Sequence, residues 1–212
     1  MPARYELHGF WPSGPTYKIG LMLSLCGEPF DYVSVNLRAT EHKAPGFVAR
    51  QRYGQVPLLV DTGNGRELTQ SASMLTYLAE HLGKFAGDTE DERIAVREWL
   101  YWEHDRLAPN VYRSRGMRIG LRSMSFDTAA QYFTEGNGAL KVLDDHLASR
   151  HWLVGSGPTI ADIDVYGVID YATVGGFDLA AYKNLSGWIT RMKGLKGFGL
   201  PEQILPKESR KA

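Results

Sequence analysis

A proline stands inside an apolar run that otherwise has the composition of a buried strand. In GQVPLLV, residues 54–60, Pro57 interrupts an uncharged stretch of Val and Leu. Proline has no N–H to donate to a sheet, so within sheets it is confined to the first residue of a strand, an edge or a bulge. Some gain at this position must offset the lost donor, which makes Pro57 a candidate functional residue.

Two further stretches lead into helix starts, where anions can bind. In LTQSASM, residues 68–74, a strand end runs into a helix whose first turn has free N–H groups and the positive end of the helix dipole, so it favours a carboxylate. In WPSGPTYKIG, residues 11–20, the same features favour an anion such as a thiolate, because a thiol pKa of about 8.5 falls near helix N-termini. Both stretches also fit ordinary capping residues, with Ser13 and Gly14 forming only a turn.

The elements that must position these stretches alternate between strand and helix over the first 83 residues. A short strand at Tyr5 and Leu7 precedes a helix that ends at Gly27, and a period-two strand follows at 31–37. After a polar, helix-tolerant stretch, the sequence VPLLV, a DTGNG turn and RELT predict a hairpin. A helix ending at Gly83 completes the order β-α-β-α-β-β-α.

Beyond this α/β domain every signal is helical. We expect a domain at 1–83, a polar linker at 84–91 and an all-helical domain at 92–212. The GNG at 136–138 predicts a break before one of the helices. Thr159 and Asp162 have the spacing of a reciprocal capping box at the start of another.

Composition excludes several classes of protein. Lys+Arg and Asp+Glu both number 24 in 212 residues, so a net charge of zero gives no support to a nucleic-acid or polybasic membrane role. No apolar run reaches transmembrane length and the first residues lack a secretory pattern, so we expect a cytoplasmic protein. The single cysteine allows no internal disulfide, and the six histidines show no ligand spacing, so no metal site is expected.

An α/β domain followed by a helical domain, with Val56-Pro57 opening the third strand, resembles the cytosolic glutathione transferases. The resemblance covers nearly the whole chain in element order and local motifs, and it is closest to bacterial theta- or zeta-like members with an active-site serine. It implies a thioredoxin-like N-terminal fold. It also implies a cis bond before Pro57, which leaves the Val56 backbone free to pair with the cysteinyl part of glutathione; a cis X–Pro bond costs only about 0.5–1 kcal/mol.

The resemblance implies roles for further residues of the first domain. Ser13 would donate its hydroxyl to the glutathione thiolate, while Gln70 and Ser71 would hold the γ-glutamyl end. Three residues are candidates for the glycyl carboxylate: His42, Lys43 and Gln55. Glutathione would then be the co-substrate of a transferase, bound as its thiolate and added to a small apolar electrophile.

The helical domain would contribute the electrophile site, between the domains, and a homodimer is implied as in many relatives. Candidate wall residues are Trp102, Tyr112 and Arg113, although aromatic side chains on helices are more often part of a core. Cys26 lies on the apolar stripe of the first helix, which predicts a core residue. The glutaredoxin-like relatives need a cysteine near the start of that helix, so exchange through a protein thiol is disfavoured.

The chain departs from the family pattern in three places. Pro15 removes a possible amide donor beside Ser13, Gln70 stands where bacterial members usually have an acidic residue, and ARQRYGQVP lacks a common Asn-Pro pair. Tyr5 and Tyr17 are the phenols that could replace Ser13. The competing hypothesis is a non-catalytic glutathione-binding or interaction module with the same fold. Glutathione-dependent isomerisation or dehalogenation would use the same thiolate.

Overall fold

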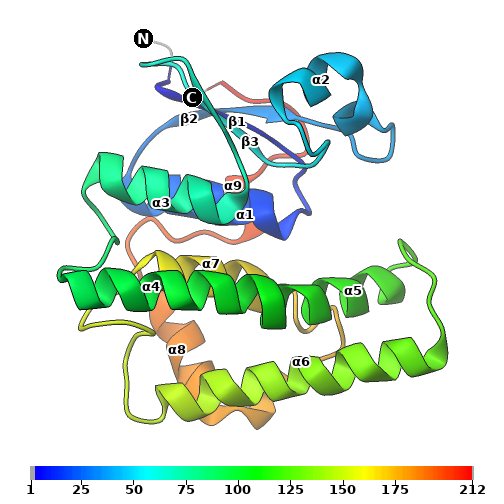
Figure 1. Cartoon of the computed structure of the whole chain (residues 1–212), viewed down its shortest axis with the longest axis vertical. Coiled ribbons are helices and arrows are strands. Elements are labelled where there is room, and N and C mark those ends of the chain that lie inside the picture. The colour runs from blue at the N-terminus through cyan, green and yellow to red at the C-terminus, as the bar shows by residue number, and fades with distance from the viewer. Residues whose placement is uncertain (1–2, 212) are drawn as a thin grey trace. The chain divides into compact units, whose positions relative to one another are not determined.

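The structure is a computed structural model that describes residues 3–211, and these form two compact units (Figure 1). The first unit combines the chain up to Lys84 with the segment from Leu195 onward, and the second runs from Phe85 to Gly194. Each unit has its own apolar core. The fold is that expected from the sequence, a thioredoxin-like domain and a helical domain.

The first unit is built on a four-stranded mixed sheet. Its strands are β1 (Tyr5–Gly9), β2 (Phe30–Ser34), β3 (Leu58–Asp61) and β4 (Arg66–Thr69), in the order β2-β1-β3-β4. β1 and β2 are parallel, whereas β3 is antiparallel to both β1 and β4. The predicted hairpin and the predicted order of elements are both confirmed.

Helices cover the two faces of this sheet. Figure 1 shows α1 (Gly14–Cys26) and α3 (Ser71–Leu82) side by side on one face and α2 (Pro45–Arg50) on the other. The short helices η1 (Glu41–Lys43) and α9 (Pro201–Ile204) complete the unit. Left-handed glycines at the predicted positions, Gly27 and Gly83, end α1 and α3.

The segment from Leu195 differs from the sequence expectation, which assigned it to the helical domain. It belongs to the first unit because it bonds to α1 and β2: the Tyr17 hydroxyl donates to the Gly199 carbonyl at 2.8 Å, and Tyr32 and Arg210 exchange two backbone hydrogen bonds of 2.7 and 2.8 Å. The Ser34 N–H also donates to the Ser209 hydroxyl at 2.9 Å. The outer edge of β2 is thereby bonded at Tyr32 and Ser34.

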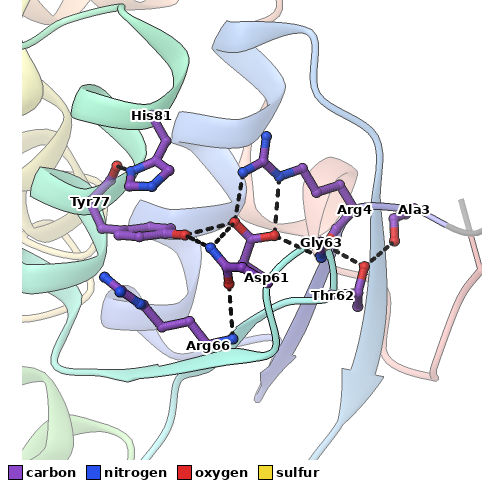
Figure 2. A network of polar contacts seen from close by, with 9 residues as sticks. Ala3, Arg4, Asp61, Thr62, Gly63, Arg66, Tyr77 and His81 are labelled. Atoms are coloured by element: carbon purple, nitrogen blue, oxygen red, sulfur yellow. Dashed lines mark hydrogen bonds and ion pairs between the residues drawn. The ribbon is translucent and has the colours of Figure 1, made fainter.

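A buried carboxylate ties the start of the chain to the hairpin (Figure 2). The Asp61 carboxylate accepts two hydrogen bonds from the Arg4 guanidinium, at 2.8 and 3.1 Å, and one from the Tyr77 hydroxyl at 2.7 Å. The Gly63 N–H donates to it at 3.0 Å from within the turn. Arg4 lowers the pKa of Asp61 most, and Tyr77 adds to the effect.

Replacement of Arg4 by glutamine is expected to move acid unfolding to higher pH. A carboxyl whose folded pKa is lowered contributes stability above its unfolded pKa of about 3.9, and that stability is lost as pH falls through the folded pKa. Without Arg4 the pKa of Asp61 rises, so the loss of stability begins at a higher pH. Circular dichroism against pH measures the midpoint. Arg66→Gln is the matched control, since the Arg66 backbone reaches Asp61 through Asn64 and its guanidinium lies 5.5 Å from the centre of the Tyr77 ring rather than on the carboxylate.

The second unit is all helical. It contains α4 (Glu90–Trp102), the π-helical turn η2 (Glu103–Leu107), α5 (Ala108–Arg118), α6 (Phe126–Leu147), α7 (Ile160–Ile169), η3 (Leu179–Ala181) and α8 (Lys183–Lys193). α7 is buried along its whole length. The predicted capping box at its start is confirmed, since the Thr159 side chain and the Asp162 carboxylate each accept a backbone N–H.

The break predicted at GNG is wrong, because α6 continues through residues 136–138. Gly136 packs against the ring of Phe177, where a Cβ would come within 2.5 Å of two ring carbons. Asn137 donates its side-chain amide to the Phe133 carbonyl one turn earlier, at 2.8 Å. Close packing at Gly136 therefore explains the glycine that the sequence suggested as a breaker. Among residues 3–211, no helix is both long and apolar enough to cross a bilayer.

Candidate active site

The strand register brings four loops of the first unit to one end of the sheet. Leu58, the first residue of β3, pairs with His8 on one side and with Thr69 on the other. The chain entering β3 therefore lies beside the chain leaving β1 and the chain leaving β4. The parallel pairing of Gly9 with Ser34 adds the chain that leaves β2. Most of the predicted glutathione residues are in these four loops.

The bond between Val56 and Pro57 is cis, as predicted. β3 begins only at Leu58, so Val56 precedes the ladder. Among the described residues, neither the N–H nor the C=O of Val56 has a hydrogen-bond partner. Val56 is partly exposed. An extended ligand could therefore pair with both groups as an added strand would.

Gln51 positions this loop, and the sequence reasoning missed it. Its side chain is 1% exposed, its carbonyl accepts from the N–H groups of Tyr53 and Gln55 at 3.0 and 3.3 Å, and its amide donates to the Pro57 carbonyl at 3.5 Å. A buried amide that bonds three backbone groups holds the approach to Val56 in one conformation. The sequence does contain a hint of this role. Gln51 is a polar residue six positions before Pro57, in the segment ARQRYGQVP that departs from the family pattern.

Gln70 and Ser71 stand where β4 passes into α3. Gln70 has a φ of 69° and a ψ of 118°, a conformation that residues other than glycine rarely adopt and that clusters at functional sites. α3 begins at Ser71, and no side chain caps it. Its first amides and the Ser71 hydroxyl lie at a partly exposed helix N-terminus, which suits a carboxylate.

Ser13 is the N-cap of α1, which was one of the two interpretations of this residue. Its hydroxyl oxygen accepts the Thr16 N–H at 3.3 Å. Acceptance through a lone pair leaves the hydroxyl proton available for donation, so capping and thiolate binding are compatible. Pro15 lies in the first turn, where its missing N–H costs the helix no hydrogen bond.

The two phenols proposed as substitutes for Ser13 lie in the interior. The Tyr17 hydroxyl donates to the Gly199 carbonyl, and Tyr5 is fully buried in β1 with its pKa raised by that burial. Ser13 is partly exposed. Of the three hydroxyls, only that of Ser13 has both exposure and a position at the start of α1.

His42, Lys43 and Gln55 belong to the loops that flank Val56. The Lys43 ammonium donates to the Gly54 carbonyl at 2.8 Å, so it lies against the loop that carries Gln55. Burial, and then the charge of Lys43, lower the pKa of His42, which favours the neutral imidazole at pH 7. No described residue bonds its buried Nδ1.

The three candidate wall residues of the helical unit do not gather into one surface. Tyr112 points to α7, where its hydroxyl donates to the Gly167 carbonyl at 3.0 Å and its ring meets that of Tyr171. Arg113 instead donates to the Tyr132 hydroxyl of α6 at 2.9 Å. Trp102 packs edge-on against Trp99. Each therefore has a structural partner within its own unit.

Cys26 is buried at the end of α1, as predicted. Burial raises the pKa of its thiol to about 11, so the nucleophilic thiolate is scarce at neutral pH. No group of three or more His, Cys, Asp or Glu side chains in the described part of the chain is arranged to hold a metal ion.

Comparisons with known proteins agree with this geometry. Residues 15–81 match the family "Glutathione S-transferase, N-terminal domain" and residues 126–195 match "Glutathione S-transferase, C-terminal domain". A maleylacetoacetate isomerase of Rhizobium meliloti is 30% identical over 91% of this chain and 92% of its own length. The disulfide-bond oxidoreductase YfcG of Escherichia coli is 26% identical over 90% of this chain and 91% of its own.

Solved structures give the same result. A possible glutathione S-transferase from Rhodopseudomonas palustris superposes with a TM-score of 0.87 at 31% identity, over 93% of this chain and 90% of its own. The chain belongs to the glutathione S-transferase family and is an enzyme of that family. Ure2p in complex with glutathione, at 20% identity and a TM-score of 0.85, shares the fold over 93% of this chain and 92% of its own.

Proposed function

We propose that the protein binds glutathione at the loop end of the sheet and adds its thiolate to a small apolar electrophile. The observation that carries this proposal is the unpaired N–H and C=O of Val56 beside the left-handed Gln70. The cysteinyl backbone of glutathione would add to Val56 as a short strand, and its γ-glutamyl carboxylate would lie at the start of α3.

We assign the remaining contacts with glutathione to residues of the neighbouring loops. Ser13, at the start of α1, donates a hydrogen bond from its hydroxyl to the sulfur and favours the thiolate. His42, Lys43 and Gln55 serve the glycyl carboxylate, His42 as a neutral hydrogen-bond donor. The protein orients the thiolate and stabilises its charge rather than supplying a covalent nucleophile. The helical unit supplies residues for the electrophile; Trp102, Tyr112 and Arg113, which do not share one surface, are separate candidates. The enzyme acts as a homodimer in the cytoplasm.

Calorimetry with glutathione and turnover of an aryl halide, an epoxide and an enone test the proposal together. Saturable binding with turnover of at least one electrophile supports a transferase. Saturable binding without turnover would instead support the non-catalytic module, and absence of binding would overturn both.

A second candidate is glutathione-dependent isomerisation. It is favoured by the 30% identity to a maleylacetoacetate isomerase, and it needs the same thiolate, which adds to a double bond and leaves again. Conversion of maleylacetoacetate with no net consumption of glutathione would distinguish isomerisation from transfer.

Replacement of Ser71 by alanine is expected to weaken glutathione binding about tenfold. Loss of a hydrogen bond to a charged group costs about 1.5–3 kcal/mol, and 1.4 kcal/mol corresponds to a factor of ten. Calorimetry measures the dissociation constant. Ser73→Ala, in the same first turn but more exposed, is the matched control and should bind as the wild type does. Equal affinities for the two variants would mean that the carboxylate binds elsewhere.

A further inference from the structure

The C-terminal segment, residues 195–211, packs along α1 (Figure 1). The buried Ile204 side chain lies on Gly20 of α1, where a Cβ would come within 2.7 Å of the Ile204 Cγ2 atom. Near the end of α1, the Ser24 hydroxyl donates to the Gly197 carbonyl at 2.6 Å. The segment is therefore fastened to the helix at more than one turn.

The same segment contacts the loop that leads into α1. Two hydrogen bonds close this loop on itself: the Ser13 N–H donates to the Phe10 carbonyl at 2.8 Å, and the Phe10 N–H donates to the Thr16 hydroxyl at 3.4 Å. Trp11 follows Phe10 in the loop and is partly exposed. The Lys207 ammonium lies over the indole ring of Trp11, 5.4 Å from the ring centroid. A residue near the end of the chain thus contacts one that stands two positions before the candidate catalytic serine.

Backbone and side-chain bonds to β2 fix the position of Lys207. Its carbonyl accepts a hydrogen bond from the Ser34 hydroxyl at 3.1 Å, and the Ser34 N–H donates to the Ser209 hydroxyl. Within the described residues no carboxylate forms an ion pair with the Lys207 ammonium, so its charge is available to the ring. The face of tryptophan is the aromatic surface that attracts a cation most strongly.

We propose that Lys207 is a positioning residue, which holds through Trp11 the loop that directs the Ser13 hydroxyl at the glutathione sulfur. This inference rests on the function proposed above and adds the C-terminal segment to the site. A hydrogen bond weakens steeply when its distance or angle departs from the optimum. A loop released from Lys207 would therefore direct the hydroxyl at the sulfur for less of the time. Because the other glutathione contacts lie in other loops, affinity should change little.

Replacement of Lys207 by glutamine is expected to raise the pKa of the bound thiol and to lower kcat about two- to fivefold, the factor that one exposed cation–π contact supplies. The dissociation constant of glutathione should stay nearly unchanged. An ultraviolet titration of the thiolate band, steady-state kinetics and calorimetry measure the three quantities. Lys207→Arg keeps a cation on the ring and should restore both the pKa and the turnover.

The matched control is Lys196→Gln, which removes the same charge from an exposed position of the same segment. Within the described residues the Lys196 ammonium has neither a carboxylate nor a ring partner. The control should titrate and turn over as the wild type does. Equal thiol pKa values in Lys207→Gln and Lys196→Gln would overturn the proposal.

Replacement of Trp11 by leucine tests whether Lys207 acts through the ring. Trp11→Leu should also raise the thiol pKa, and the double variant with Lys207→Gln should be no worse than the worse single variant, since both remove the same contact. Additive losses would mean that the Lys207 charge acts on the sulfur directly, which would overturn the positioning role.

The contact itself can be measured without glutathione. In protein labelled with 5-fluorotryptophan, the ¹⁹F resonance that Trp11→Leu assigns among the five tryptophans should shift in Lys207→Gln and stay in place in Lys196→Gln. An unshifted resonance in Lys207→Gln would overturn the contact.

Ser13→Ala separates a failure of this inference from a failure of the proposed function. If Ser13→Ala raises the thiol pKa and Lys207→Gln does not, only the positioning role of Lys207 is wrong. If the wild type does not bind glutathione, or if Ser13→Ala leaves the thiol pKa unchanged, the proposed role of Ser13 is wrong and the role of Lys207 falls with it.

Discussion

Replacement of Asp162 by alanine is expected to lower the free energy of unfolding by about 3–5 kcal/mol, the largest stability effect we expect. The carboxylate is fully buried and accepts from the Leu153 N–H at 3.0 Å, from the Thr159 N–H at 2.9 Å and from the Trp188 indole N–H at 2.8 Å. Alanine would leave these buried donors without an acceptor, and each costs about 1–3 kcal/mol.

Urea denaturation followed by tryptophan fluorescence measures the loss. Thr159→Ala removes the cap of the same box and the 3.2 Å hydrogen bond from the Thr159 hydroxyl to Asp162, and should cost about 1–2 kcal/mol. Asp162→Asn keeps one acceptor oxygen and should fall between the two. If Asp162→Ala is too unstable to purify, the free energies of unfolding of Asp162→Asn and Thr159→Ala can still be compared, and this comparison tests the network. A smaller loss for Asp162→Asn than for Thr159→Ala would contradict a central role for this carboxylate.

Replacement of Ser13 by alanine is expected to lower turnover about ten- to hundredfold while leaving glutathione affinity nearly unchanged. A hydroxyl that donates to a thiolate favours the charged form and brings the bound thiol pKa below its free value of about 8.5. Loss of such a charged hydrogen bond costs about 1.5–3 kcal/mol. The remaining contacts still hold the tripeptide, so the loss falls on kcat.

An ultraviolet titration of the thiolate band in the bound complex measures the pKa, which should rise in Ser13→Ala. Because Ser13 also caps α1, two further variants separate the roles. Ser13→Asp keeps the cap but places a negative charge beside the sulfur, so it should be stable and less active than alanine. Ser13→Thr keeps both functions and should restore turnover. If wild type and Ser13→Ala titrate at the same pH and turn over equally, Ser13 is only a cap.

The order of elements in the first unit could be predicted because each local signal agreed with the tertiary structure. Gly27 and Gly83 end the helices where the sequence indicated, and the DTGNG turn joins the two strands of the hairpin. The cis bond before Pro57 came from a family resemblance rather than from periodicity. Thr159 and Asp162 formed their capping box because both of its hydrogen bonds are local.

Contacts between residues far apart in sequence could not be predicted from local patterns. From local sequence Gly136 is interpreted as a helix breaker. Its actual role depends on Phe177, which is forty-one positions later in the sequence and packs against it. Gln51 has an ordinary polar sequence context, and only the folded loop shows that three backbone groups bond it. The hydroxyl of Tyr17 is taken by Gly199 across the fold, which removes a phenol that the sequence left open.

The pairing of Tyr32 with Arg210 joins an early strand to a segment that is made last. The helical unit is continuous in sequence, whereas the first unit is completed only by the segment from Leu195, whose Arg210 bridges Tyr32 of β2 after all four strands have been made. Until then the outer edge of β2 exposes unpaired N–H and C=O groups that can template association with another chain. A fragment that stops at Lys84 would lack this pairing permanently, which makes residues 1–84 alone a poor choice for expression.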